Sequence, residues 1–240
     1  NLVQEEFILS DLGIVENRLQ RLEKEMRVRK TDLHVKEEQV LRRCKTAIDN
    51  LQPLRTLEFA PDEEILIRGY QFLSLKPHIL VPNIDEKEIG RSEAVAATLE
   101  NWAAIPKTAV LPISAQIEME IRQLSPDEAE IFRLDAGIQQ PAMNRLLRSS
   151  YQLLGLLSFF TVGEDEVRAW TIHSNTLAPQ AAGVIHSDIE RGFIRAEVVH
   201  YDDFIMRGSM AKCRAEAVLR LEGKDYIVKD GDIINFRFAV

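Results

Sequence analysis

A short polar loop follows an apolar run near the middle of the chain, and its residue types suit the binding of a purine base. Residues 78–81 are predicted to form a buried strand of a parallel sheet, and the strand leads into Asn83-Ile84-Asp85-Glu86. Ligands of open α/β sheets bind beyond the carboxyl ends of the strands. The Asn83 amide can both donate and accept, and the Glu86 carboxylate can accept from ring or exocyclic N–H groups. Asn and Asp are also ordinary turn residues, so a plain turn is the alternative interpretation.

Patterns typical of catalytic and metal sites are not found elsewhere in the sequence. No Gly-x-x-x-x-Gly-Lys-Ser/Thr segment occurs, so we expect the chain to lack the usual means of holding a triphosphate and its magnesium ion. The 5 histidines show no metal-ligand spacing, and no Ser/His/Asp or Cys/His triad is evident. We therefore predict no catalytic residue and no metal site, and we expect the chain alone not to hydrolyse nucleotides.

Composition and charge narrow the class of protein. The net charge of −8 over 240 residues argues against non-specific nucleic-acid binding by the whole chain, although it leaves room for a local basic patch. Cys44 and Cys213 are far apart and form no CxxC motif, which indicates free thiols in the cytoplasm. No apolar run is long enough to span a membrane, and no signal peptide is visible. The chain begins at Asn1 rather than Met, so we expect it to be cut from something longer.

Residues 1–60 are predicted to form an antiparallel helical hairpin. Apolar residues recur at intervals of three and four in two stretches, which is typical of helices packed along a seam. The turn is expected near residues 29–36. Near this tip lie Arg29 and Lys30, with Arg42 and Arg43 further down the second helix; these side chains could follow RNA phosphates or form a solvated surface. The two seams are Ile8, Leu12, Val15, Leu19, Leu22 and Met26, and Leu41, Cys44, Ile48 and Leu51.

Residues 61–156 alternate between helix and strand. Strands are expected at 78–82 and 108–113, and this order implies parallel strands joined by right-handed crossovers. Two parallel strands make a poor sheet by themselves, so the segment is interpreted as the second half of a larger α/β domain. An exposed edge of such a half-sheet favours a homo-oligomer or an exchange of chains.

Residues 157–240 are predicted to form a small mixed α+β domain. The residue types favour strands more than in the preceding segments, and about eighty residues are enough for such a domain to fold alone. Strands are expected at 159–162, 167–172, 193–199, 226–229 and 233–238, helices near 202–204 and 211–221, and a tight turn at 229–232.

Several of these segments together resemble the Obg-like ATPases of the YchF family, over essentially the whole chain. By this resemblance, residues 1–60 are the coiled-coil insertion, residues 61–156 the closing half of the P-loop-type, Rossmann-like G domain, and residues 157–240 a TGS domain with the ubiquitin-like β-grasp fold. The segments are Asn83-Ile84-Asp85-Glu86, Pro112-Ile113-Ser114-Ala115, Ala178-Pro-Gln-Ala-Ala-Gly183 and Asp225-Tyr-Ile-Val-Lys-Asp-Gly-Asp-Ile-Ile234.

The resemblance implies roles for the loops. Related GTPases read guanine with Asn-Lys-x-Asp, and here Ile84 and Glu86 replace the Lys and the Asp, in keeping with a family that prefers ATP and tolerates GTP. Asn83 and Ile84 would flank the base, Glu86 would occupy the clamp position, and Ser114 and Ala115 would close the pocket. The family's cofactor is ATP or GTP with Mg²⁺, which we expect this chain alone not to bind, since phosphate contacts supply much of the affinity. The alternative is that these two loops keep their structure but bind no base.

Two functions are favoured by these patterns, and a third is weaker. The first is the C-terminal two-thirds of a cytoplasmic nucleotide-switch protein that associates with the ribosome or ribosomal RNA. His186 and Arg191 could then contact RNA or protein. The second is a nucleotide-independent interaction module of translation or stress regulation. The third is a redox-responsive regulator that uses Cys44 or Cys213.

Overall fold

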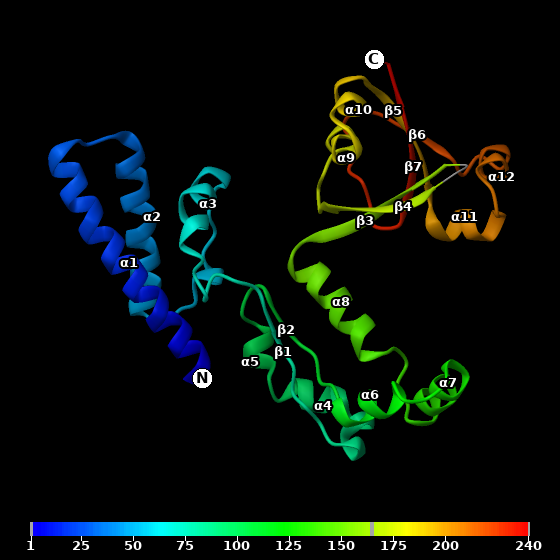
Figure 1. The fold of residues 1–240 in the computed structure, drawn as a ribbon, viewed down its shortest axis with the longest axis horizontal. Helices are drawn as coiled ribbons and strands as arrows, with labels where there is room; N and C mark the ends of the chain where they lie inside the picture. Colours follow the sequence, from blue (N-terminus) through cyan, green and yellow to red (C-terminus); the bar gives the residue numbers. More distant parts are fainter. Residues whose placement is uncertain (1, 164–165, 240) are drawn as a thin grey trace. The chain divides into compact units, whose positions relative to one another are not determined.

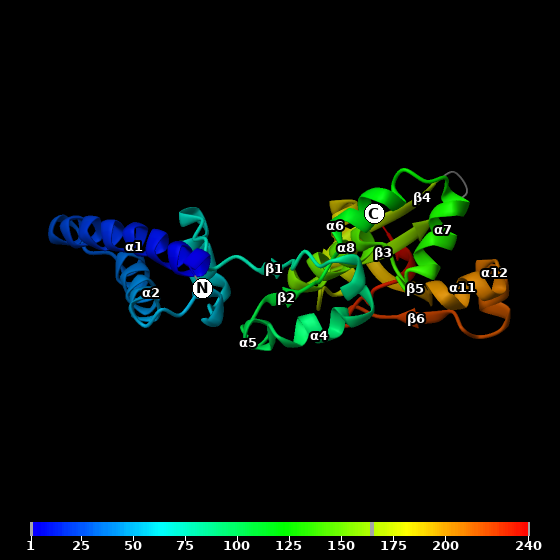
Figure 2. The ribbon, with the colours of Figure 1, turned by 90° about the horizontal axis from the view of Figure 1, so that it is seen from below.

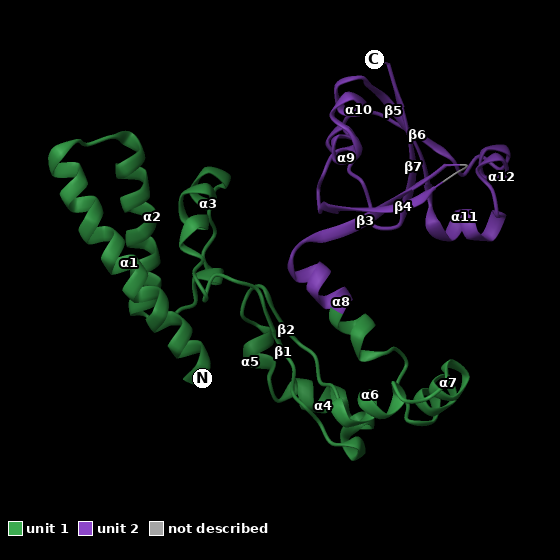
Figure 3. Ribbon diagram, viewed as in Figure 1, with its two compact units in different colours: residues 1–146 green, residues 147–240 purple. Residues whose placement is uncertain are grey.

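The structure of the protein is a computed structural model that describes residues 2–163 and 166–239. It divides into two units, residues 1–146 and 147–240, which Figure 3 draws in different colours. The mixed α/β fold class expected from the sequence is confirmed, with a helical hairpin at the start and a β-rich unit at the end. The predicted separation of residues 1–60 from 61–156 stays a prediction.

A hairpin of two helices begins the first unit. Helix α1 (Leu2–Val28) and helix α2 (Asp32–Asp49) lie side by side in both views (Figures 1 and 2). Thr31 ends the short turn and caps α2, because its hydroxyl accepts from the backbone N–H of His34 at 3.2 Å. The core of the hairpin consists of apolar side chains that are fully or almost fully buried: Ile8, Val15, Leu22, Val40, Leu41, Cys44, Ala47 and Ile48.

The prediction that Leu51 belongs to the second buried seam was wrong. Leu51 is 60% exposed, because α2 ends at Asp49 and Leu51 adopts a φ of 56° that takes the chain out of the helix. The other members of that seam, Leu41, Cys44 and Ile48, are buried.

A polar cluster that the seam pattern did not reveal also joins the two helices. Glu37 on α2 is buried, and its two carboxylate oxygens accept from Arg18 Nε and Nη2 on α1 at 2.8 and 2.9 Å. Tyr70 donates its hydroxyl to the same carboxylate. Burial opposes ionisation of Glu37, but these hydrogen bonds outweigh it and lower the pKa of the carboxyl. A bidentate charged pair of this kind specifies how α1 and α2 align.

Short helical turns connect the hairpin to a small parallel sheet. Strand β1 (His78–Leu80) pairs with β2 (Thr108–Val110), and Ile79 lies opposite Ala109. Each strand is shorter than expected, and none of their residues is fully buried. The remaining elements of this unit and of its boundary are η1 (Leu54–Thr56), α3 (Pro61–Ile67), η2 (Arg68–Tyr70), η3 (Glu86–Arg91), α4 (Ser92–Ala97), α5 (Glu100–Ala103), α6 (Ala115–Ile121), α7 (Pro126–Asp135) and α8 (Ala142–Leu153).

The second unit is built on a five-stranded mixed sheet with the order β4-β3-β7-β5-β6. Phe159 and Phe236 meet edge to face in its main core, below helix α9. Figure 1 shows α9 and α10 on one side of the sheet and α11 and α12 on the other. The bounds are β3 (Leu156–Val162), β4 (Val167–His173), α9 (Ala178–Ile185), α10 (Ser187–Arg191), β5 (Phe193–His200), α11 (Tyr201–Arg207), α12 (Met210–Ala215), β6 (Arg220–Glu222) and β7 (Asp232–Phe238).

Two sequence predictions for this unit were wrong in detail. Residues 226–229 form only an isolated bridge, between Ile227 and Leu177, and the strand at 220–222 was missed. The expected helix at 211–221 stops at Ala215, because Ala217 takes a φ of 58° and the chain then enters β6. The turn at 229–232 is present, closed by a hydrogen bond from Asp232 N to Lys229 O at 3.2 Å.

Candidate functional site

The loops that follow β1 and β2 are held together beyond the carboxyl ends of the strands. Asn83 and Ile113 form a parallel bridge, and the Ile84 N–H donates to the Ile113 carbonyl at 3.0 Å. The side chain of Asn83 adds a further link, since its Oδ1 accepts from the Ala115 N–H at 3.0 Å. The parallel register of β1 and β2 therefore brings together residues that are far apart in the sequence.

The Asn83 amide has a defined orientation as a result. Its oxygen is used by Ala115, which leaves the Nδ2 hydrogens to donate, and among the described residues no protein acceptor takes them. Asn83 is exposed, so these hydrogens can reach an external acceptor such as a ring nitrogen of a purine.

The acidic residues of the loop have separate roles. Asp85 caps η3: its carboxylate accepts from the Lys87 N–H at 3.1 Å, and Glu88 accepts from the Asp85 N–H at 3.1 Å. Glu86 is the first residue of η3 and is exposed, with no protein donor to its carboxylate among the described residues. Asp85 is therefore structural, whereas the Glu86 carboxylate can accept a hydrogen bond from outside the protein.

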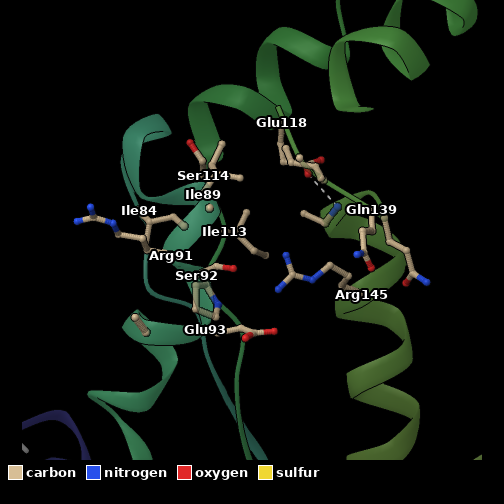
Figure 4. A pocket seen from close by; sticks show the side chains of 17 residues that line it. Ile84, Ile89, Arg91, Ser92, Glu93, Ile113, Ser114, Glu118, Gln139 and Arg145 are labelled. Atoms are coloured by element: carbon tan, nitrogen blue, oxygen red, sulfur yellow. Dashed lines mark hydrogen bonds between the residues drawn. The ribbon is translucent and has the colours of Figure 1, made fainter. Parts of the chain in front are cut away.

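A pocket of about 810 Å³ adjoins this corner and shares Ile84 and Ser114 with it. Figure 4 shows Arg145 pointing into the pocket from α8, toward Ile113, while Arg91 points away. Apolar side chains form much of one wall, and polar groups from residues 137–145 face them. The lining as a whole is more polar than apolar, so the pocket offers hydrogen-bonding groups around a smaller apolar surface.

The five residues predicted to bind a base fall into two groups. Ile84 and Ser114 are each 7% exposed and line the pocket, whereas Asn83, Glu86 and Ala115 are exposed and lie outside its lining. Sequence reasoning missed Arg145 and Gln139, which reach the pocket from beyond α7. No motif marks these two positions, and only the folding of the chain brings them to the loops.

The residues present fit one part of a nucleotide better than the other. The donor of Asn83, the acceptor of Glu86 and the apolar surface of the pocket match the edge and the face of a purine base. The sequence contains no Gly-x-x-x-x-Gly-Lys-Ser/Thr segment, the usual means of holding a triphosphate. Within residues 2–163 and 166–239, no cluster of three His, Cys, Asp or Glu side chains is placed to hold a metal ion.

The basic residues predicted to contact a partner differ in how they are paired. Arg42 binds Glu38, Arg43 binds Glu63 and stacks over the Phe59 ring, and Arg191 pairs with Asp188, beside His186. By contrast, Arg29 and Lys30 are exposed in the turn between α1 and α2, and in the described part of the chain neither pairs with a carboxylate. Of the six predicted residues, these two have the charge most available to a partner.

Both cysteines are buried. Cys44 and Cys213 are each 0% exposed, and burial raises the pKa of the Cys44 thiol to about 12. The reactive thiolate of Cys44 is therefore scarce at neutral pH, which weighs against its use as a redox sensor. Among the described helices, none has both the length and the apolar character needed to cross a lipid bilayer.

Comparison with known proteins gives a consistent result along the chain. Residues 156–239 match the family model described as "YchF-GTPase_C: Protein of unknown function (DUF933)". The "Ribosome-binding ATPase YchF" of Bacillus subtilis (strain 168) is 40% identical over 237 residues, which cover 98% of this chain and 64% of that protein. The protein of the same name from Escherichia coli O157:H7 is 38% identical over 239 residues, covering 100% of this chain and 65% of that protein.

The chain belongs to the YchF family. It matches the C-terminal part of YchF proteins and spans just under two thirds of the length of these curated relatives. A solved structure, that of the Schizosaccharomyces pombe YchF GTPase, superimposes with a TM-score of 0.78 at 27% identity, over 98% of this chain and 64% of that one. The YchF fold therefore extends through both units.

Proposed function

We propose that this chain is the C-terminal part of a YchF-type switch protein that binds ATP, and also GTP, and associates with the ribosome in the cytoplasm. In the complete protein the nucleotide would be accompanied by Mg²⁺, and its phosphates would be held by residues that this sequence does not contain. Asn83, Ile84, Glu86, Ser114 and Ala115 would contact the base. The similarity to proteins named ribosome-binding ATPases, at 40% identity over 98% of the chain, supports this proposal.

The observation that carries the proposal is the hydrogen bond from Ala115 N to Asn83 Oδ1. It leaves the Asn83 amide hydrogens facing outward, beside an exposed carboxylate at Glu86 and a pocket with an apolar wall. A donor and an acceptor at fixed positions next to an apolar surface are what recognition of a planar heterocycle requires. The bond ties the loop after β1 to Ala115 at the start of α6 and so fixes the orientation of the amide.

Titration of the chain with adenosine and ATP, followed by NMR, tests this proposal. We expect both ligands to shift the signals of Asn83 and Ala115 with similar, weaker than micromolar affinity, because the triphosphate gains no contact in this chain. Asn83→Ala should abolish the shifts, and Asn17→Ala, an exposed Asn on α1, should leave them unchanged. Micromolar ATP binding would contradict the claim that the phosphate-binding part lies elsewhere, and no response to either ligand would contradict the base site.

The ribosome association can be tested separately by co-sedimentation. Arg29 and Lys30 are the unpaired cations at the hairpin tip, so reversing both charges should reduce binding to ribosomes and its sensitivity to salt. The matched control is Arg21→Glu with Lys24→Glu, which reverses two exposed charges on α1 without touching the turn. Equal loss in both double variants would mean that overall charge rather than the tip determines binding.

The second candidate function is a module that binds RNA or protein in translation or stress regulation without any nucleotide. The feature that favours it is the absence of a phosphate-binding segment from the 240 residues. In this case ribosome binding by the chain would be unchanged by Asn83→Ala. The switch function instead predicts that adenine nucleotides alter ribosome binding by the complete protein, and that Asn83→Ala removes this effect.

We also infer a homo-oligomer through the small sheet. In the described residues β1 pairs with β2 on one edge and with no strand on the other, and Val81 next to it is 47% exposed. An unpaired edge of this kind favours pairing with another copy. Analytical ultracentrifugation should detect a dimer of the chain, and a monomer at all concentrations would refute this inference.

A further inference from the structure

One face of the sheet in the second unit changes from apolar to basic along its length. Alternation along β5 and β7 places Val199, Glu197 and Arg195 on this face, opposite Ile233, Asn235 and Arg237 respectively. Helices α11 and α12 cover the apolar end, where Val199, Ile233 and Cys213 are buried together. Arg195 and Arg237, at the other end, are exposed.

A single carboxylate holds two arginines in place at this end. Glu197 Oε2 accepts from Arg237 Nη2, Arg214 Nη2 and Asn235 Nδ2, each at 3.2 Å. Glu197 is 8% exposed, and although burial opposes its ionisation, the hydrogen bond from Arg237 and its neighbours lowers its pKa. The carboxylate is therefore charged at neutral pH and orients Arg237 from β7 and Arg214 from α12.

Arg195, the third arginine on this face, has no carboxylate partner among the described residues. It lies directly opposite Arg237 across the strand pair. Two like charges at directly opposite positions destabilise a sheet. Three arginines thus surround one carboxylate that pairs with only two of them, Arg214 and Arg237, which leaves an excess of positive charge on an exposed face of a chain whose net charge is −8.

We propose that this face, formed by Arg195, Arg237 and Arg214 around Glu197, binds the phosphates of an RNA strand. The planar fork of arginine suits bidentate contact with phosphate, and a pair of guanidinium groups side by side suits a polyanion rather than a single small anion. The choice of RNA over an acidic protein rests on the proposed association with the ribosome. Contacts made only to phosphates carry no sequence information, so the binding is independent of sequence.

The cost of placing Arg195 opposite Arg237 is offset when phosphates lie between the two side chains. In the free protein the two cations repel each other, and the bound polyanion removes this repulsion as it releases its own counterions. Arg195→Gln should therefore weaken RNA binding without weakening the fold. That combination separates a binding role from a structural one.

Fluorescence anisotropy with a labelled single-stranded RNA of mixed sequence tests the proposal on the whole chain. We expect Arg195→Gln with Arg237→Gln to weaken binding at least tenfold at low salt and to reduce the slope of log K against log salt by about 1.4, since each phosphate contact on a single strand contributes about 0.7. Arg148→Gln, an exposed arginine on α8, is the matched control for Arg195→Gln and should change the affinity less than twofold.

Each outcome decides the question. Loss of RNA binding in the double variant, with the control unchanged and the thermal unfolding of Arg195→Gln no lower than that of the original chain, supports the proposal. Equal affinities for all variants, or no binding of RNA by the original chain, overturn it. Loss of ribosome co-sedimentation with RNA affinity retained also overturns it and assigns the face to an acidic protein. Ribosome binding and RNA affinity that both survive the double variant refute this face while leaving the proposed function intact.

Discussion

The two sheets of this chain differ in how they are stabilised. In the five-stranded sheet, β5 and β7 each bury residues on both faces, under α9 on one side and α11 and α12 on the other. In the two-stranded sheet, every residue of β1 and β2 is only partly buried. The larger sheet therefore carries its own core, whereas the smaller one mainly holds loops in place. The candidate base site therefore lies on the less buried of the two sheets, where a ligand can reach the loops.

The largest expected effect is on the core of the larger sheet. Phe159 is 0% exposed and contacts Phe236 edge to face, so Phe159→Ala should cost about 3–5 kcal/mol of the unfolding free energy of the second unit. Ile79→Ala, in the half-buried strand β1, should cost about 1 kcal/mol by the same reasoning about buried area. Urea unfolding followed by thiol labelling measures both, because buried Cys213 reports on the second unit and buried Cys44 on the first. Similar losses of unfolding free energy in the two variants would contradict the stated difference between the two sheets.

A smaller loss is expected at the charged pair inside the hairpin. Glu37→Gln removes the negative charge that pairs with Arg18 and accepts from the Tyr70 hydroxyl. Because Arg18 is partly exposed, we expect the unfolding free energy of the first unit to fall by about 2 kcal/mol. Labelling of Cys44 should become faster, with Cys213 unaffected. Glu23→Gln, which removes an exposed partner of Arg27, is the control and should change little.

The same carboxylate gives a pH dependence with a definite sign. The folded-state pKa of Glu37 is lowered, so its contribution to stability is present above the unfolded pKa of about 4.3 and is lost as the pH falls through the lower, folded value. Original chain and Glu37→Gln should therefore converge in the stability of the first unit in acid. A difference that persists undiminished below that range would show that Glu37 acts without its charge.

A smaller effect on stability is expected at Asn83, in the loop that follows β1. Asn83→Ala removes the acceptor for the Ala115 N–H, and a hydrogen bond of this kind contributes about 1 kcal/mol. Hydrogen exchange at Ala115 should accelerate, while the amides of β5 and β7 keep their protection. Unchanged exchange at Ala115 would mean that the backbone bridge between Asn83 and Ile113 suffices to join the loops.

The smallest expected effect has the opposite sign. Lys107 precedes β2 with a φ of 55°, a conformation that costs little for glycine and more for lysine. Lys107→Gly should therefore stabilise the first unit by up to about 0.5 kcal/mol, once the greater freedom of glycine in the unfolded chain is included. Gln71→Gly, at a φ of 53° outside the sheet, is a control for the general effect. A loss of stability would indicate that the Lys107 side chain makes a contact that outweighs the strain.

Helix faces and helix starts could be predicted from short stretches of the sequence. The intervals of three and four in the first helices predicted the buried residues Ile8, Val15 and Leu22, because these positions share one face of a helix. The start of α7 is also set locally, by a capping box between Ser125 and Glu128. The predicted strand at 226–229 is reduced to one bridge, between Ile227 and Leu177, because its pairing partner is a short connection before α9 rather than a strand.

By itself, the sequence determined which residues lie on one face of an element and which family the chain belongs to. Only the tertiary structure decided which faces meet. Alternation on β5 puts Arg195 and Glu197 on the same side, but nothing local indicates that Arg237 lies opposite Arg195, or that Arg145 points into a pocket beside Ile84. The reason is physical: periodicity is a property of one segment, whereas register and pocket lining are set by packing between segments far apart in the chain.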